Sequence, residues 1–126
     1  MKFRLVIVTL VTLLTGQGSS AQDSNVTGLF STFRLSEESG DIDGAEIHIV
    51  RNPTGYSAIV QASEGAPGFP EVVNILVKGT TIEFSIPKNS ASGFEPGTYF
   101  GIVTKEGLNL RGPKGLYESY FMPRKP

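Results

Sequence analysis

The sequence predicts an all-β domain built as an antiparallel up-and-down meander of about eight strands. Apolar and polar residues alternate with a period of two from residue 28 to the end of the chain. No stretch of about a dozen residues shows apolar positions at helical spacing without a glycine or a proline inside it. Short and long connections also alternate, which is typical of a meander because successive connections lie at opposite ends of the sheet.

The first segment, 1–21, has the composition of a secretory signal peptide. Lys2 and Arg4 give a positively charged start, an apolar run covers 5–14, and Ser19-Ser20-Ala21 offers small residues for cleavage. The alternative is a membrane anchor, but the run is shorter than the roughly 20 apolar residues that a spanning helix needs. We therefore expect cleavage after Ala21, export to the periplasm or the medium with no membrane span afterwards, and a single all-β domain over 22–126.

The composition excludes several kinds of protein. The chain has no cysteine, so it forms no disulfide, no thiolate metal site and no cysteine nucleophile. Without Lys2 and Arg4, 9 of its 11 basic residues remain against 12 acidic ones, and the mature net charge is about −3. No basic stripe is present to neutralise phosphates, so nucleic acid is not an expected partner.

Eight segments have the alternation and the flanking turn residues of strands. They cover about 28–35, 44–51, 56–62, 71–78, 80–87, 98–104, 108–111 and 116–122. Tight turns are expected at 52–55, 78–79 and 105–107, and the long connections 36–43, 63–70 and 88–97 are expected together at the other end, joined by 111–115. Eight antiparallel strands tend to close into a barrel or to fold over as a sandwich, because open edges aggregate. We predict a barrel, with a β-sandwich as the alternative.

Because successive side chains of a strand point to opposite faces, the alternation also predicts which residues form the core. The predicted core face carries Leu29, Phe33, Leu35, Ile47, Ile49, Tyr56, Ala58, Val60, Val73, Ile75, Val77, Ile82, Phe84, Ile86, Tyr99, Val103, Leu108, Leu110, Tyr117 and Phe121. The predicted outer face is unusually apolar, with Phe30, Val50, Ile59, Val72, Leu76, Phe100, Ile102, Leu116, Tyr120 and Met122. Either a partner covers this face, or both faces are partly buried as in a sandwich.

The order and spacing of several segments resemble a known family. Gly28-Leu29-Phe30 resembles its opening strand, 63–70 its serine, glycine and proline loop, 78–87 its central hairpin and 99–108 its closing aromatic and glycine pattern. The family is the lipocalin-like (calycin-like) β-barrel domain of bacterial exported proteins, of the kind found ahead of serine-hydrolase domains. The resemblance implies a calycin-like barrel and no catalytic residues, although the opening strand lacks the tryptophan that the family leads us to expect.

Nothing in the sequence predicts an enzyme, a metal site or a cofactor. His48 is the only histidine, and no Gly-x-Ser-x-Gly motif supplies a nucleophile for it. Asp41-Ile42-Asp43-Gly44 is similar to the start of a calcium loop, but the later oxygen ligands and the closing glutamate of an EF-hand do not follow. A hydrolase that uses carboxylates alone is the least favoured alternative, since no two carboxylates are placed together by the pattern.

The candidate binding residues lie on the long connections and in the predicted barrel interior. Glu37, Glu38, Asp41 and Asp43 make the loop end acidic, which attracts a cationic partner. Phe69 and Phe94 lie in the two later loops, where they either bind a partner or fold down to plug the barrel. Tyr56 and Tyr99 are expected inside, where eight strands enclose enough space for side chains or for one small molecule.

The sequence therefore predicts an exported binding or interaction module without enzymatic activity, which binds a small apolar ligand or a partner protein. The alternative is an inhibitor or immunity-type protein that blocks an enzyme with its long loops, since the acidic loop end complements a cationic lysozyme. Ser92-Gly93 is similar to the serine-glycine loop of bacterial lysozyme inhibitors.

Overall fold

A computed structural model describes residues 25–113 and 120–126 as an all-β domain, which confirms the predicted fold class. Its strands are β1 (Gly28–Ser31), β2 (Arg34–Leu35), β3 (Ile42–Asn52), β4 (Gly55–Pro67), β5 (Glu71–Lys78), β6 (Thr81–Ile86), β7 (Gly97–Val103), β8 (Gly107–Arg111) and β9 (Tyr120–Lys125). The predicted signal peptide lies outside the described residues, as do residues 116–119 of the last predicted strand.

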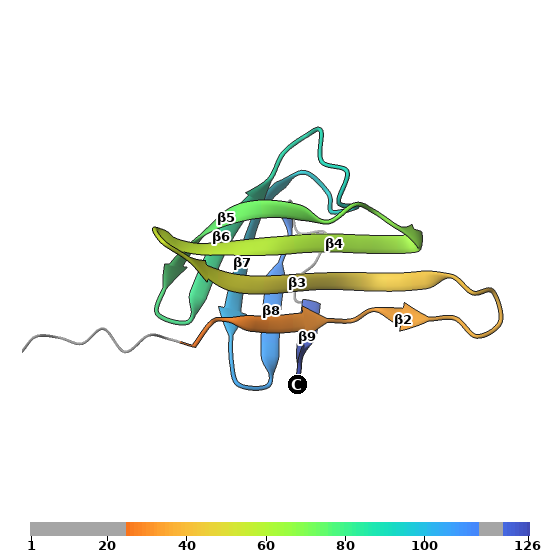
Figure 1. The fold of residues 1–126 in the computed structure, drawn as a ribbon, viewed down its shortest axis with the longest axis horizontal. Helices are drawn as coiled ribbons and strands as arrows, with labels where there is room; N and C mark the ends of the chain where they lie inside the picture. Colours follow the sequence, from red (N-terminus) through yellow and green to blue (C-terminus); the bar gives the residue numbers. More distant parts are fainter. Residues whose placement is uncertain (1–24, 114–119) are drawn as a thin grey trace, which may run out of the picture.

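The strands close into a barrel (Figure 1). Each strand from β3 to β9 pairs antiparallel with the next, and β1 pairs with both β9 and β3. β1 and β2 face β3 in one continuous register, from Gly28 opposite Ile49 to Leu35 opposite Ile42. They therefore form a single strand interrupted at 32–33, and the closed barrel has eight strands. The predicted meander and barrel are confirmed, and the β-sandwich alternative is wrong.

The connections lie as the meander requires. The turns between β3 and β4, β5 and β6, and β7 and β8 are short, while the connections between β2 and β3 and between β6 and β7 are longer. β3 and β4 extend beyond the barrel towards β2 (Figure 1). The predicted loop 63–70 is wrong over 63–67, because β4 continues to Pro67 and pairs with the extended β3 as far as Gly65. This three-stranded extension forms one wall of the barrel's loop end.

The interior of the barrel is apolar, and the predicted phase of the middle strands is confirmed. Its buried residues are Val26, Phe30, Ala45, Ile47, Ile49, Ala58, Val60, Val73, Ile75, Ile82, Phe84, Ile86, Tyr99, Val103, Leu108, Leu110 and Met122. Phe84 and Tyr99 stack with their ring centroids 5.2 Å apart and their planes nearly parallel. Tyr56 and Val77, which were predicted inside, are only partly buried against this core.

In the first and last strands, the residues that point into the barrel are the ones that were predicted to point outward. Phe30 and Met122 are fully buried, whereas Phe121 is 45% exposed and Leu35 is exposed. Both strands carry neighbouring apolar residues, such as Leu29 and Phe30, so the period of two does not distinguish their inner face from their outer face. Closure of the barrel between β1 and β9 decides which face points inward, because Phe30 and Met122 are the side chains that fill the interior there. Leu29 and Phe33 are left half-buried.

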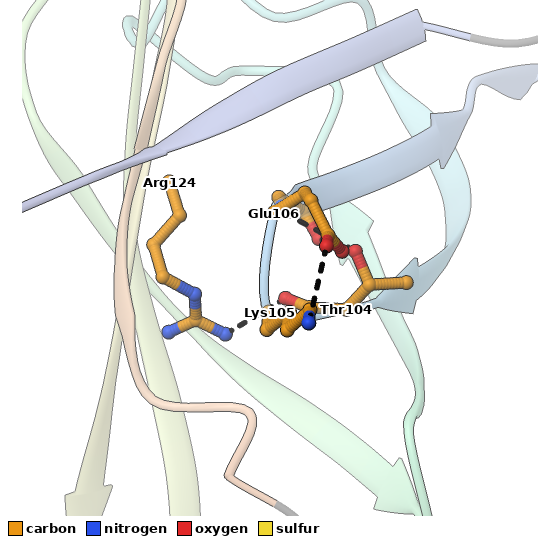
Figure 2. Close-up of polar contacts among 5 residues, drawn as sticks. Thr104, Lys105, Glu106 and Arg124 are labelled. Atoms are coloured by element: carbon orange, nitrogen blue, oxygen red, sulfur yellow. Dashed lines mark hydrogen bonds and ion pairs between the residues drawn. The ribbon is translucent and has the colours of Figure 1, made fainter.

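Arg124 on β9 closes the barrel at the short-turn end. Its guanidinium donates hydrogen bonds to the backbone oxygens of Thr27 (2.7 Å), Asn25 (3.3 Å) and Thr104 (3.0 Å). It also lies over the ring of Phe30, 4.8 Å from the centroid. Figure 2 shows the guanidinium pointing at the turn that carries Thr104 and the Lys105–Glu106 ion pair. One side chain thus joins β9, the β7–β8 turn and the segment that leads into β1.

The interruption between β1 and β2 depends on a glycine. Gly44 has a φ of +116°, and a Cβ built there lies 2.5 Å from the backbone oxygen of Thr32. The neighbouring Ala45 amide donates to the hydroxyl of Thr32 (3.0 Å) instead of to a strand carbonyl. At position 44 the backbone lies too close to Thr32 for a Cβ atom, and its positive φ is unfavourable for any residue other than glycine.

Gly44→Ala is expected to lower the free energy of unfolding by about 2 kcal/mol, because backbone strain and the contact with Thr32 add. Gly40→Ala is the matched control: Gly40 also has a positive φ (+75°), but no atom lies within 4 Å of a Cβ there. The control should cost about 1 kcal/mol, from strain alone. Urea unfolding checks both, and equal losses would contradict the close approach.

Candidate ligand-binding site

The barrel interior is filled at one end and open at the other. Towards the short turns the large side chains of the core meet one another, including Phe30, Ile49, Leu108 and Met122. Towards the long connections the inward positions of β3 and β4 are small, since they carry Ala45 and Ala62. A cup with a volume of about 420 Å³ lies there. Its size falls within the range of small-molecule sites, roughly 300–1,000 Å³.

We call this space the cup. It is lined by Arg34, Asp43, Gly44, Ala45, Ala62, Ser63, Glu64, Gly93, Phe94, Glu95, Tyr99, Leu110, Gly112 and Tyr120. These residues come from the β2–β3–β4 extension on one side and from β7, β8, β9 and the β6–β7 connection on the other. The cup therefore combines an apolar floor with a polar rim, which is the usual composition of a ligand site.

The aromatic wall of the cup is built from Phe94, Tyr99 and Tyr120. The ring of Phe94 meets that of Tyr99 edge-on, with centroids 5.6 Å apart and an interplanar angle of 86°. The Tyr99 hydroxyl donates to the backbone oxygen of Glu95 (2.8 Å), which orients the ring. Tyr120 and Thr32 share a hydrogen bond through their hydroxyls. Two of the three rings are thus held by their own hydroxyls.

The β6–β7 connection is hydrogen-bonded to β4 and to the β4–β5 connection, and these bonds hold Phe94 in place. The Ala62 amide donates to the Ser92 oxygen (2.7 Å), and the Phe69 amide donates to the Ala91 oxygen (2.8 Å). The Phe94 amide donates to the hydroxyl of the fully buried Ser92 (3.3 Å). The β6–β7 connection therefore acts as a fixed wall of the cup.

A second set of hydrogen bonds anchors this wall to the barrel. Ser90 donates its hydroxyl to the carboxylate of Glu71, and the hydroxyls of Ser90 and Ser92 are 2.7 Å apart. Gly68 packs so closely on the Ser92 backbone that a Cβ would lie 2.4 Å from it. Because Ser92 is enclosed on all sides, its side chain is not presented at the surface as the serine of an inhibitory loop would be.

The rim of the cup is acidic. Arg34, Asp43 and Glu64 face one another across β2, β3 and β4, and Glu95 lies on the opposite connection. All four side chains are exposed, and Asp43 accepts a hydrogen bond from the amide of Gly65 (3.0 Å). Three carboxylates against one guanidinium give the rim a net negative charge, which favours a cationic ligand group.

Of the residues predicted to bind, Phe94, Tyr99 and Asp43 lie together in the cup. Glu37, Glu38 and Asp41 are exposed in the connection between β2 and β3 and do not line it. The other two predicted aromatics lie elsewhere. Phe69 is 76% exposed outside the cup, and Tyr56 lies beside the β3–β4 turn, its ring centroid 5.5 Å from the guanidinium of Arg51.

Other lining residues were missed by sequence reasoning, notably Tyr120, Ala62 and Arg34. Tyr120 was predicted on the outer face because the phase of the last strand was wrong. Ala62 was missed because a small residue on a strand gives no signal of its own; only the larger side chains around it make its position a space. Arg34 lies opposite Asp43 in the pairing of β2 with β3, and it was missed because the inner face of the first strand was predicted wrongly.

The described residues hold no group of three or more histidine, aspartate or glutamate side chains placed to bind a metal ion. His48 lies exposed on the outer face of β3, between Leu29 of β1 and Ile59 of β4 in the cross-strand row. Within the same described residues, no helix has the length and apolar character needed to cross a membrane.

Comparison of the chain with protein-family models, with curated proteins and with solved structures finds no match.

Proposed function

We propose that this chain is an exported, non-enzymatic binding protein that holds a small amphipathic cation in the cup, its apolar ring inside and its ammonium group at the rim. The observation that carries the proposal is the cup itself, an open space of about 420 Å³ in a barrel whose other end is filled. The closed eight-stranded meander supports a calycin-like barrel, the architecture that the sequence resemblance implies.

The chemistry of the lining supports this class of ligand. An aromatic ring that enters the cup meets Phe94 and Tyr99, and a buried aromatic contact contributes about 0.5–1.5 kcal/mol beyond its area. An ammonium group at the mouth lies among Asp43, Glu64 and Glu95, while Arg34 is the one opposing charge among the described lining residues. The walls are held by hydrogen bonds before any ligand enters, so binding costs little ordering entropy.

A matched pair of fluorophores tests the proposal. Dansylcadaverine and dansylglycine share the same apolar ring system, but the first carries an ammonium group and the second a carboxylate. Titration of the purified protein should shift the dansylcadaverine emission to the blue and give a Kd at least about tenfold lower than that of dansylglycine, which corresponds to about 1.4 kcal/mol. Equal affinities would contradict the acidic rim, and no binding of either probe would contradict the cup.

Two substitutions distinguish the contribution of the apolar floor to probe binding from that of the acidic rim. Ala62→Leu places a larger side chain in the cup and should weaken both probes, whereas Glu64→Gln should weaken dansylcadaverine and leave dansylglycine unchanged or improved. Ile59→Ser, on the outer wall, is the control and should change neither. Far-ultraviolet circular dichroism verifies that each variant is folded. Probe binding that survives Ala62→Leu unchanged would place the ligand elsewhere.

The acidic rim also supports a second candidate function, the inhibition of a cationic enzyme such as a lysozyme. An assay of lysozyme on peptidoglycan, with the protein in excess, tests it. Inhibition that is lost in Glu64→Gln would favour this candidate, and full lysozyme activity would remove it.

A further inference from the structure

The outer face of β6, β7 and β8 carries an apolar patch that the cup does not use. Phe100 and Ile102 on β7 are each 52% exposed, and Leu76 on β5, the neighbour of β6, is 67% exposed. A groove of about 540 Å³ runs over this face, and its lining includes Lys78, Glu83 and Arg111 together with these apolar side chains. The three strands lie side by side behind β3 and β4 in Figure 1, away from the extension that forms the cup.

The residues of this face are arranged symmetrically about β7. In one cross-strand row, Phe100 lies between Glu83 of β6 and Arg111 of β8. In the next row, Ile102 lies between Thr81 of β6 and Asn109 of β8. Each row thus has an apolar centre with complementary groups on its two sides: a carboxylate opposite a guanidinium in the first, and a hydroxyl opposite an amide in the second.

We propose that this face binds the same face of a second copy of the chain, with a two-fold axis running along β7. Neighbouring strands are about 4.8 Å apart on either side of β7, so the axis brings β6 of one copy over β8 of the other. Glu83 then meets Arg111 of the second copy, and the symmetry makes a second, identical ion pair. Phe100 and Ile102 pack against their own counterparts at the centre of the interface.

The pairing satisfies two charged side chains that have no partner in the described part of the chain. Among the residues that the structure describes, neither the Glu83 side chain nor the Arg111 side chain has a hydrogen bond or an ion pair, and Phe100 keeps the two side chains two strand spacings apart. A second copy supplies the opposite charge to both and covers the apolar centre. Two sheets packed face to face lie about 10 Å apart, which suits side chains of this size. Charge complementarity of the face with itself is therefore the reason to expect a second copy.

Sedimentation velocity of the purified protein over a concentration series tests the proposal. The wild-type protein should form a dimer with a Kd on the order of micromolar, the weakest affinity typical of interfaces of standard size. Phe100→Ser should leave a monomer. Val72→Ser is the matched control, because Val72 is 68% exposed on β5 but lies outside the two rows, and it should leave the dimer intact. A wild-type protein that stays monomeric at about a hundred times that Kd would overturn the proposal.

A charge exchange makes the test specific for the proposed axis. Glu83→Arg and Arg111→Glu each place like charges together twice in the dimer, so each should raise the Kd by about 100-fold, from about tenfold for each of the two contacts. The double variant restores both pairs with their signs reversed and should return to near the wild-type Kd. A double variant as weak as the single ones would refute this arrangement. Dansylcadaverine binding is measured in parallel, because the cup and this face are separate and either proposal can fail alone.

Discussion

Phe30→Ala is expected to lower the free energy of unfolding by about 4 kcal/mol, the largest loss that we predict for a single substitution in this chain. Phe30 is fully buried, where β1 meets both β3 and β9, and its ring also lies under the guanidinium of Arg124. Removing the ring leaves a cavity at the point where the barrel closes. Equilibrium unfolding in urea measures the loss through the shift of the midpoint.

The neighbouring Leu29→Ala is the control, and it also distinguishes the two possible phases of this strand. Leu29 is only half-buried on the outer face, so its truncation should cost about 1 kcal/mol. The sequence alone predicted the reverse order, with Leu29 inside and Phe30 outside. If Leu29→Ala proves the more damaging substitution, the inner face of β1 assigned by the structure is wrong.

Arg124→Ala is expected to lower the free energy of unfolding by about 3 kcal/mol. The guanidinium donates to three backbone oxygens from two separate segments and covers the ring of Phe30. A hydrogen bond from a charged group contributes about 1.5–3 kcal/mol net, and the two bonds that are exposed to water contribute less than the part-buried one. The substitution releases both the segment before β1 and the β7–β8 turn from β9. Thermal unfolding followed by circular dichroism measures the loss.

Two variants sharpen this prediction. Arg124→Lys keeps the charge, but the lysine ammonium group lacks the planar guanidinium that reaches all three acceptors. This variant should therefore recover only part of the lost free energy of unfolding. Lys125→Ala, at the exposed neighbouring position, should be within about 0.5 kcal/mol of the wild type. A full recovery by lysine would mean that charge alone matters at this position, contrary to the hydrogen-bonded geometry.

These two substitutions and the cup lie at opposite ends of the barrel. The short-turn end is held by large apolar side chains and by Arg124, whereas the loop end has small inward residues and an open space. Stability is therefore concentrated away from the candidate site. For that reason rim variants such as Glu64→Gln should change probe binding while leaving the unfolding midpoint nearly unchanged.

Part of the candidate site was predictable from the sequence, and part was not. Tyr99 and Asp43 were recognised because one alternates with apolar residues on a strand and the other belongs to an acidic cluster at the loop end. Phe94 and Phe69 had the same local signals, since both are aromatic residues beside glycine and proline. Only the packing of the connections separates them, because the Phe94 amide is tied to Ser92 and its ring to Tyr99, while Phe69 stays exposed.

The sequence by itself determined the all-β class, the meander and the inner face of the middle strands, because strand alternation and turn residues are local properties of the chain. Only the tertiary structure decided the inner face of the first and last strands, where Phe30 and Met122 replace Leu29 and Phe121 inside. It also decided that the barrel closes and that an open cup remains at one end. Closure and empty space depend on residues far apart in sequence meeting in three dimensions, and no local pattern records such a meeting.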